Sequence, residues 1–401
     1  MEVTIRTILA GLFVLALAGC NPTPPPTPPP TPPPVAVRGL AYPSATGGGD
    51  LEPLPVEPAL PIHRIYFPQL FNPPPPPAVL GYEIAHESRV AGAMTQVEEI
   101  GQIATVWTRQ SLNWRQVEPA PGRYLWPPAM DKAVDLLHPH ANLVLVLADI
   151  PAWALQYPEW PCGPLDPAQT AAFADYAVAA VLRYQPEAVE LWNEPDAPIS
   201  PEAKGWGCWS INGQERAGGK AYGQAMLPAV AAIRKASPQT QILSGGLLFG
   251  CEVDGYFGCP GQDFLAGIQE SGLLAVIDGV AFHAYAQWFG EDDPPNARYL
   301  AWKATTIRRI TGDLSLWMTE GGYLCHPSAG ELCESVTYRE HQAAYVPMLA
   351  QECEAQGLTA CIWYSLTYNG WRYADMLGPA GPELAYWAYL QELRRETRSR
   401  P

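Results

Sequence analysis

Eight short apolar segments alternate with eight helix-like segments after residue 78, and this alternation predicts a (β/α)8 barrel. Most of the strand segments are continuous apolar runs, as expected when helices cover both faces of a parallel sheet. The alternative is a doubly wound open sheet, which usually carries a glycine-rich phosphate loop after its first strand. No such loop is present, and the closed barrel is therefore the preferred fold class.

The elements follow from the periodicity of apolar residues along the chain. The predicted strands are Val79–Ile84, Thr105–Arg109, Asn142–Ala148, Ala188–Trp192, Gln241–Ser244, Gly279–His283, Ser315–Thr319 and Ala360–Ser365. The predicted helices are Ala93–Ile100, Pro128–Leu137, Pro167–Tyr184, Gly219–Ala236, Gln262–Glu270, Tyr299–Ile310, Tyr338–Gln356 and Pro382–Arg394. The folded domain is expected to cover residues 78–396.

Residues 1–20 are predicted to be a signal peptide rather than part of the domain. One arginine precedes an apolar run that is too short to span a bilayer comfortably. The segment ends in Leu17-Ala18-Gly19-Cys20, which resembles a bacterial lipoprotein signal with Cys20 as the lipidated residue. The alternative is an ordinary secretory signal with an incidental cysteine. The resemblance implies an exported protein that is anchored to the cell envelope by its N-terminal lipid.

Residues 21–77 are predicted to form a proline-rich stalk. Proline fixes φ and lacks a backbone donor, so the Thr-Pro-Pro-Pro repeats favour an extended spacer. A ligand for an SH3-type domain is the alternative reading of these proline runs. The short apolar segment His63–Phe67 is a candidate edge strand of the domain.

Composition and charge narrow the range of partners. The 401 residues are 48% hydrophobic, which excludes a globally disordered chain, and carry a formal net charge of −16. Phosphate binding needs a basic surface, so no nucleic-acid partner is expected. Membrane contact is expected through the N-terminal lipid alone, and the oligomeric state is not readable.

Eight cysteines remain after Cys20, and an even number in an exported chain suggests disulfides. Three sequential pairs are each eight positions apart, namely Cys251 with Cys259, Cys325 with Cys333, and Cys353 with Cys361. Cys162 and Cys208 would then form the fourth pair. A zinc site is the rival interpretation, but the chain has no Cys-x-x-Cys motif, and no metal or other cofactor is expected.

Polar and aromatic residues gather where the predicted strands end, which in a barrel is the active-site face. They are Arg109 on strand 2, Asn193 and Glu194 after strand 4, His283 and Tyr285 at strand 6, Glu320 after strand 7 and Trp363 on strand 8. Strands 4 and 7 face each other across a closed barrel, so Glu194 and Glu320 are expected to converge. Paired carboxylates suit glycosidic bond cleavage, in which one is a proton donor and the other is ionised.

The neighbours of these residues have more modest predicted roles. Asn193 is a candidate ligand for a sugar hydroxyl, and Tyr285 is expected to hydrogen-bond Glu320. Arg109 is counted with them, and with His283, among the candidate substrate-binding residues, and it is expected to keep a nearby carboxylate ionised. An ion pair at the end of the barrel is the alternative interpretation of Arg109. Trp363 is a candidate floor for a sugar ring, and ordinary core packing is the alternative. Trp153, Trp288 and Trp371 are placed in the loops after strands 3, 6 and 8, as further candidate sugar platforms, and loop packing is the alternative for each.

These motifs resemble glycoside hydrolase clan A, a superfamily of retaining (β/α)8-barrel glycosidases, over about residues 78–393. Asn193-Glu194-Pro195 and Thr319-Glu320-Gly321 carry the resemblance, together with His283-Ala284-Tyr285. The segments 114–119 and 122–126 also look like the loop after strand 2 in families 39 and 5. The resemblance implies that Glu194 is the acid/base and Glu320 the nucleophile, with Arg109, His283, Tyr285 and Trp363 matching other positions of the clan. Gly321-Gly322 departs from the pattern, because many members have a bulky residue there.

The resemblance implies a hydrolase of β-linked poly- or oligosaccharides that needs no cofactor. Two other functions stay open at this stage. One is a carbohydrate-binding protein that has lost turnover, since a barrel alone does not prove activity. The other is a transglycosylase, which would share the covalent intermediate. The sugar, the linkage and the choice between chain ends and interiors are not readable from the sequence.

Overall fold

The computed structural model describes residues 78–158, 162–197, 209, 213–250, 260–291 and 294–399. The chain divides into two units, residues 1–68 and 69–401, and all described residues belong to the second. The signal peptide, lipidation at Cys20, the stalk and the candidate edge strand 63–67 lie outside the described residues and stay predictions. Among the helices described, none is both long and apolar enough to cross a membrane.

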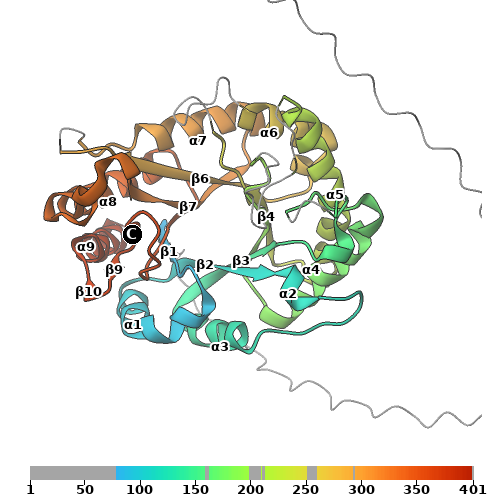
Figure 1. The fold of residues 1–401 in the computed structure, drawn as a ribbon, viewed down its shortest axis with the longest axis horizontal. Helices are drawn as coiled ribbons and strands as arrows, with labels where there is room; N and C mark the ends of the chain where they lie inside the picture. Colours follow the sequence, from blue (N-terminus) through green and yellow to red (C-terminus); the bar gives the residue numbers. More distant parts are fainter. Residues whose placement is uncertain are drawn as a thin grey trace, which may run out of the picture. The chain divides into compact units, whose positions relative to one another are not determined.

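Eight parallel strands close into a barrel in sequence order, so the predicted (β/α)8 fold is confirmed (Figure 1). The strands are β1 Leu80–Glu83, β2 Val106–Asn113, β3 Ala141–Ala148, β4 Ala188–Asn193, β5 Gln241–Gly246, β6 Gly279–Trp288, β7 Ser315–Cys325 and β8 Ala360–Trp363. The open sheet is excluded because β8 pairs with β1, with Leu80 opposite Cys361. A short antiparallel pair, β9 Leu377–Gly378 and β10 Gly381–Pro382, follows β8.

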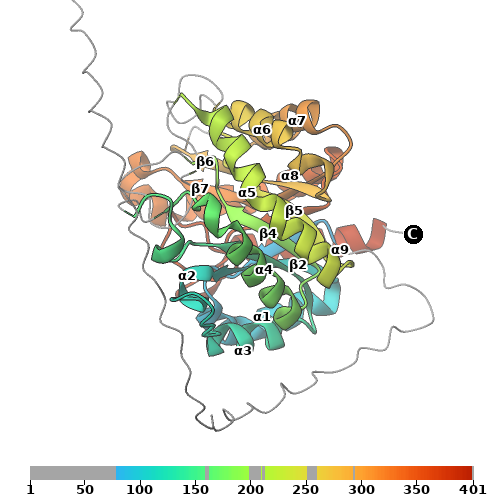
Figure 2. The same ribbon diagram turned by 90° about the vertical axis from the view of Figure 1, so that its right-hand side faces the viewer.

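The helices surround the strands, as Figure 1 shows. They are α1 Met94–Ile103, α2 Trp114–Val117, α3 Pro128–Leu137, α4 Thr170–Tyr184, α5 Glu215–Ala236, α6 Pro260–Ser271, α7 Arg298–Thr311, α8 Val336–Ala355 and α9 Leu384–Ser399. Short 3-10 segments lie at 87–93, 152–154, 167–169, 273–275 and 327–334. Helices α4 and α5 lie side by side outside β4 (Figure 2). Local signals set several ends: Pro128 is in the first turn of α3, and the Ser335 side chain caps α8.

The interior of the barrel is filled by two large rings and several small side chains. Trp107 and Trp317 meet edge to face with centroids 4.7 Å apart. They share a buried cluster with small and branched residues from β3, β4, β5, β6 and β8, namely Val144, Ala188, Leu243, Ala281, Ala360 and Ile362. Inward-facing residues alternate with outward-facing ones along a strand. The cluster therefore fixes which side chains of each strand point inward, and hence which reach the barrel mouth.

Strands β6 and β7 are longer than the sequence predicts. They pair as far as Trp288 and Cys325, whereas the apolar runs suggested ends at His283 and Thr319. The prediction that Trp288 lies in a loop after strand 6 is therefore wrong, because Trp288 is the last residue of β6. Its side chain is fully buried against Tyr338 and His341.

Of the four predicted disulfides, the two whose cysteines all lie within the described residues are confirmed. Cys325 pairs with Cys333, and Cys353 pairs with Cys361. Cys162 is also disulfide-bonded, but its predicted partner Cys208 lies outside the described residues. The pair predicted between Cys251 and Cys259 lies outside them as well.

Candidate active site

Glu194 lies directly after β4, at the mouth of the barrel. Its backbone has φ 47° and that of Trp192 has φ 92°, both in the left-handed region that non-glycine residues rarely adopt. The Glu194 amide donates to the Gly246 carbonyl of β5 at 2.9 Å, and the Glu194 carbonyl accepts from Ala197 at 2.9 Å. These bonds hold the strained turn, which presents the carboxylate at the rim.

Glu320 reaches the same mouth because the pairing of β7 is irregular. Strict alternation from the inward-facing Trp317 would turn Glu320 toward the helices. The register between β7 and β8 shifts between Met318 and Gly321, and that between β6 and β7 shifts at His283. Irregularities of this kind re-aim side chains and are frequent next to active sites. The shift brings Glu320 beside Arg109 and Tyr285.

The two carboxylates converge as the sequence predicts. One oxygen of Glu194, one of Glu320 and a ring nitrogen of His283 lie within 4.8 Å of one another. The Glu194 and Glu320 side chains are 15% and 11% exposed, so both are accessible from the barrel mouth. His283 lies between them, with Nδ1 2.9 Å from Glu194 Oε1 and 3.5 Å from Glu320 Oε2.

A glycine makes room for this histidine. His283 is fully buried, and a Cβ at Gly246 would come within 2.2 Å of its Nε2. Any larger residue at position 246 would displace the imidazole from the two carboxylates. The sequence expectation that His283 belongs to the site agrees with this geometry. Its burial means that it acts on the carboxylates and does not face a ligand.

Arg109 is the centre of a buried network of carboxylates. Its guanidinium donates to Glu83 Oε2 at 2.9 Å, to Glu190 Oε1 at 2.7 Å and to Asn193 Oδ1 at 2.6 Å, and also to Glu320 Oε1. The side chain is completely buried. The sequence interpretation of Arg109 as a substrate-binding residue is therefore corrected: its donors are all aimed at protein groups, and it positions Glu320.

Sequence reasoning missed two members of this network, Glu83 on β1 and Glu190 on β4. Both are buried, at 4% and 0% exposure. A signal was present, because each charged residue stands in an otherwise apolar strand, two positions after an inward-facing residue. A charge at such a position needs a partner when it is buried, and Arg109 on β2 is the shared partner.

The network perturbs the ionisation of several groups. Burial alone would raise the pKa of Glu320, but the charges of His283 and Arg109 and the hydrogen bond from Tyr285 outweigh it and lower that pKa. Burial would lower the pKa of His283, but the adjacent Glu320 and Glu194 raise it overall. Burial raises the pKa of Glu83 to about 8, against the opposing charge of Arg109. Glu320 is thus the carboxylate that the site keeps ionised, while Glu83 holds a proton at neutral pH.

Tyr285 holds the second oxygen of Glu320. Its hydroxyl donates to Oε2 at 2.6 Å, as expected from the sequence, while Arg109 Nη1 donates to Oε1. Burial raises the pKa of Tyr285 well above its ordinary value, so the hydroxyl stays protonated and remains a donor. Both oxygens of Glu320 are therefore oriented before any ligand arrives.

The aromatic residue beside Tyr285 at the barrel mouth is Tyr364, which directly follows β8, and not Trp363. Trp363 is 1% exposed, packs against Tyr345 of α8 and donates from Nε1 to the Ala374 carbonyl at 2.9 Å. Because Ala360 and Ile362 face the barrel interior, alternation turns Trp363 outward to the helices. Its interpretation as a sugar floor is corrected accordingly. The partly exposed Tyr364 ring lies 6.3 Å from that of Tyr285.

The other tryptophans differ in accessibility. Trp153 is partly buried and tied to the Glu118 carbonyl through Nε1 at 3.0 Å, and its ring packs against Trp114. Trp288 is fully buried, as described above, so it offers no face to a sugar. Trp371 is 40% exposed and lies 5.2 Å from the Tyr285 ring, ring centre to ring centre. Of these three residues, Trp371 alone combines an exposed ring with a contact to the site.

Glu194, His283 and Glu320 together are also the one group of potential metal ligands found among the described residues. The donor set fits a divalent cation poorly. Both Glu320 oxygens already accept hydrogen bonds from Arg109 and Tyr285, and the guanidinium adds a positive charge next to the position a cation would take.

The comparisons with known proteins identify the fold. No family model and no curated protein matches the chain. Similar solved structures include a family 39 glycoside hydrolase from Bacteroides cellulosilyticus WH2, with 18% identity, TM-score 0.55 and coverage of 80% of this chain and 64% of that one. An exo-β-1,4-mannosidase from Opitutaceae bacterium strain TAV5 has 16% identity, TM-score 0.55 and coverage of 80% and 60%.

A psychrophilic family 10 endo-β-1,4-xylanase is also similar, with 15% identity, TM-score 0.53 and coverage of 78% of this chain and 96% of the xylanase. The chain spans less than two thirds of the length of the first two proteins. At these identities the likeness establishes the fold: the chain has the (β/α)8 barrel that glycoside hydrolases use.

Proposed function

We propose that this protein is a retaining glycoside hydrolase that cleaves β-linked poly- or oligosaccharides. The observation that carries the proposal is the pair Glu194 and Glu320, with carboxylate oxygens within 4.8 Å of each other at the barrel mouth. Retaining enzymes place their two carboxyl groups about 5–5.5 Å apart, whereas inverting enzymes leave room for a water between them. The fold shared with family 39, family 10 and mannosidase structures supports a carbohydrate substrate.

The environments of the two residues divide their roles. Glu320 is the ionised nucleophile, because His283, Arg109 and Tyr285 stabilise its negative charge. Glu194 donates its proton to the glycosidic oxygen as the bond from that oxygen to the anomeric carbon breaks. An oxygen of Glu320 forms the new bond to the anomeric carbon. The covalent intermediate keeps the sugar at the mouth of the barrel.

Hydrolysis completes the cycle. Glu194, now ionised, removes a proton from water as the water oxygen attacks the anomeric carbon. The bond to Glu320 breaks, and its electron pair returns to the carboxylate. Asn193 accepts a hydrogen bond from Arg109 through Oδ1, which leaves its amide N–H groups as donors toward a sugar hydroxyl. The two inversions give a product that retains its configuration.

The test is a screen of chromogenic β-glycosides and β-glucans, mannans and xylans, followed by NMR of the first anomer released. We expect retention, and loss of at least about a thousandfold in kcat/KM for Glu320→Ala. Glu331→Ala is the matched control, because Glu331 is exposed on the 3-10 segment after β7. An inverted product, or turnover by Glu320→Ala close to wild type, contradicts the mechanism. Binding without hydrolysis across the whole panel would favour a carbohydrate-binding protein. Transfer of the sugar to an added acceptor sugar would favour a transglycosylase.

We also propose that the protein is exported and anchored through Cys20. The support is the lipoprotein-like end of residues 1–20, followed by the proline-rich residues 21–34. In a bacterial host, the wild type is expected in the membrane fraction and Cys20→Ala in the soluble fraction. Equal partitioning of the two proteins would refute the anchor.

A further inference from the structure

We propose that Trp371 is a stacking platform for the sugar chain on the Glu320 side of the barrel mouth, and that the Cys325–Cys333 disulfide holds the loop that carries it. The inference deepens the proposed function, on which it rests, by assigning a ligand-binding residue and the structure that sets its position. The loop is residues 364–376, between β8 and β9.

The exposed ring of Trp371 belongs to a cluster beside the nucleophile. Its centroid lies 5.2 Å from that of Tyr285 and 5.3 Å from that of Tyr364, at interplanar angles of 75° and 86°. Tyr285 in turn donates to Glu320 at 2.6 Å. A sugar ring has an apolar face of C–H groups that packs on an aromatic face, and Trp371 is 40% exposed. Since Tyr285 contacts both Trp371 and Glu320, the platform serves the sugar bound on the Glu320 side of the scissile bond.

The loop is held from one side by helix α8. The Tyr373 carbonyl accepts from Tyr338 Oη at 2.9 Å, from Gln342 Nε2 at 2.9 Å and from Arg339 Nη1 at 3.3 Å. Arg372 and Tyr373 have φ of 47° and 55°, values that a non-glycine residue keeps only when its surroundings impose them. The three donors from α8 impose this turn directly after Trp371.

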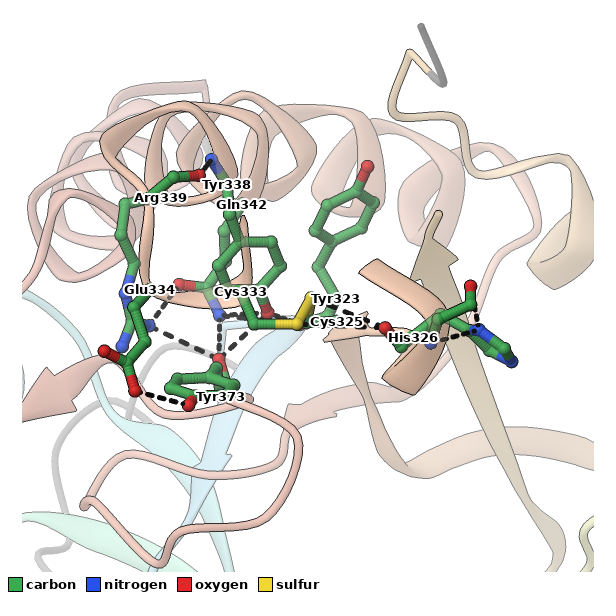
Figure 3. The surroundings of a disulfide bond; sticks show 11 residues. Tyr323, Cys325, His326, Cys333, Glu334, Tyr338, Arg339, Gln342 and Tyr373 are labelled. Atoms are coloured by element: carbon green, nitrogen blue, oxygen red, sulfur yellow. Dashed lines mark hydrogen bonds between the residues drawn. A yellow bond between two sulfur atoms is a disulfide. The ribbon is translucent and has the colours of Figure 1, made fainter. Parts of the chain in front are cut away.

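The second side of the loop is held by the segment that the disulfide closes. Figure 3 shows the Cys325–Cys333 bond and the hydrogen bond between Tyr373 and Glu334. Cys325 donates its amide to the Arg372 carbonyl at 3.0 Å, and Glu334 accepts from the Tyr373 hydroxyl at 2.9 Å. The bond from Cys325 to Cys333 closes the segment between these two contact points. Residues 325–334 are therefore hydrogen-bonded to the Trp371 loop at both of their ends, through Cys325 and Glu334.

The chain contains a matched control for this disulfide. Cys353–Cys361 has the same sequence separation of 8. It joins the end of α8 to the start of β8, at the opposite end of the barrel from the loop. Trp387 on α9 is the control for Trp371, because it is 48% exposed and its ring packs against Tyr386 instead of Tyr285 and Tyr364.

The experiment measures affinity separately from turnover. Each variant is made in the Glu320→Gln background, and binding of cellotetraose, mannotetraose and xylotetraose is measured by titration calorimetry. For the tightest of the three, Trp371→Ala is expected to raise Kd about tenfold, and Trp387→Ala to leave it unchanged. Cys325→Ser/Cys333→Ser is expected to raise Kd at least threefold, and Cys353→Ser/Cys361→Ser to leave it unchanged.

Tyr338→Phe tests the same loop if the disulfide variant does not fold, because it keeps the disulfide and removes one hydrogen-bond donor to the loop. It is expected to raise Kd by a smaller factor. An unchanged Kd for Trp371→Ala overturns the platform, as does binding of none of the three probes. The proposed role of the Cys325–Cys333 disulfide is overturned if Kd is unchanged in both Cys325→Ser/Cys333→Ser and Tyr338→Phe. It is also overturned if removal of either disulfide changes Kd equally.

The two proposals fail in different ways. If the wild type releases reducing sugar but Trp371→Ala leaves Kd unchanged, the platform proposal is wrong and the hydrolase proposal stands. If binding depends on Trp371 but the protein cleaves nothing, the hydrolase proposal is wrong and the platform proposal stands.

Discussion

At the scale of single residues, the site is defined by one arginine that serves several carboxylates. Arg109 contacts Glu83, Glu190 and Glu320, while His283 approaches Glu194 and Glu320. The negative groups outnumber the positive ones, so a buried carboxyl that holds a proton reduces the imbalance. Glu83 has that role, since its pKa is raised to about 8.

Glu83→Gln tests this assignment. The folded protein keeps the Glu83 proton up to about pH 8, whereas the unfolded chain loses it near the ordinary value of 4.5. The free energy of unfolding contributed by this group is therefore fully present at acid pH and falls as pH rises toward 8. Glu83→Gln should gain stability relative to wild type as pH rises from about 5 to 8, as measured by urea denaturation.

The same substitution should move the alkaline limb of the activity profile to higher pH, because glutamine cannot ionise beside Glu320. Glu87→Gln, on the 3-10 segment after β1, is the control and should leave both profiles unchanged. A stability difference between Glu83→Gln and wild type that does not vary with pH would show that Glu83 is ionised in the folded protein.

Chelation tests whether Glu194, His283 and Glu320 bind a metal ion. Both oxygens of Glu320 accept hydrogen bonds from protein donors, and a cation would have to displace them. We therefore expect EDTA to leave kcat/KM unchanged. Loss of activity on chelation, restored by an added divalent cation, would instead assign Glu194, His283 and Glu320 as metal ligands.

At the scale of elements, the strands are packed through the rings in the barrel interior. Trp317 of β7 is fully buried against Trp107 of β2, and small residues such as Ala281 and Ala360 leave space for them. Because Trp317 precedes Glu320 on the same strand, this packing also fixes the base of the segment that carries the nucleophile.

Trp317→Ala should lower the free energy of unfolding by about 3–5 kcal/mol, through lost burial and the cavity left behind. The exposed Trp387→Ala should change it by less than about 0.5 kcal/mol. Chemical denaturation of the two variants measures the difference. Similar losses for both would mean that the interior rings do not carry the stability assigned to them.

At the scale of the whole molecule, two short disulfides act on opposite ends of the barrel. Cys353–Cys361 and Cys325–Cys333 both close loops with a sequence separation of 8. The chain-entropy model gives about 2.5 kcal/mol for a loop of this size. Cys353→Ser/Cys361→Ser should therefore lower the free energy of unfolding by about that amount. A thermal midpoint equal to that of the wild type would contradict this value.

The sequence by itself determined the order of strands and helices, the location of Glu194 and Glu320 at the barrel mouth and two of the disulfides. These are local signals: apolar runs mark buried strands, polar residues mark their ends, and short spacings favour local pairing. Glu83 and Glu190 were also within reach of sequence reasoning, since a charge in a buried strand must find a partner.

The tertiary structure alone decided which side chains face the barrel mouth. Trp363 and Trp288 are buried and Tyr364 is presented, because the inward or outward direction depends on strand register and on the irregular pairing around Glu320. A shift of one residue reverses the face of every side chain that follows, and no local pattern specifies where such a shift occurs. The convergence of Glu83, Glu190 and Glu320 on Arg109 likewise exists only once β1, β2, β4 and β7 share one closed sheet.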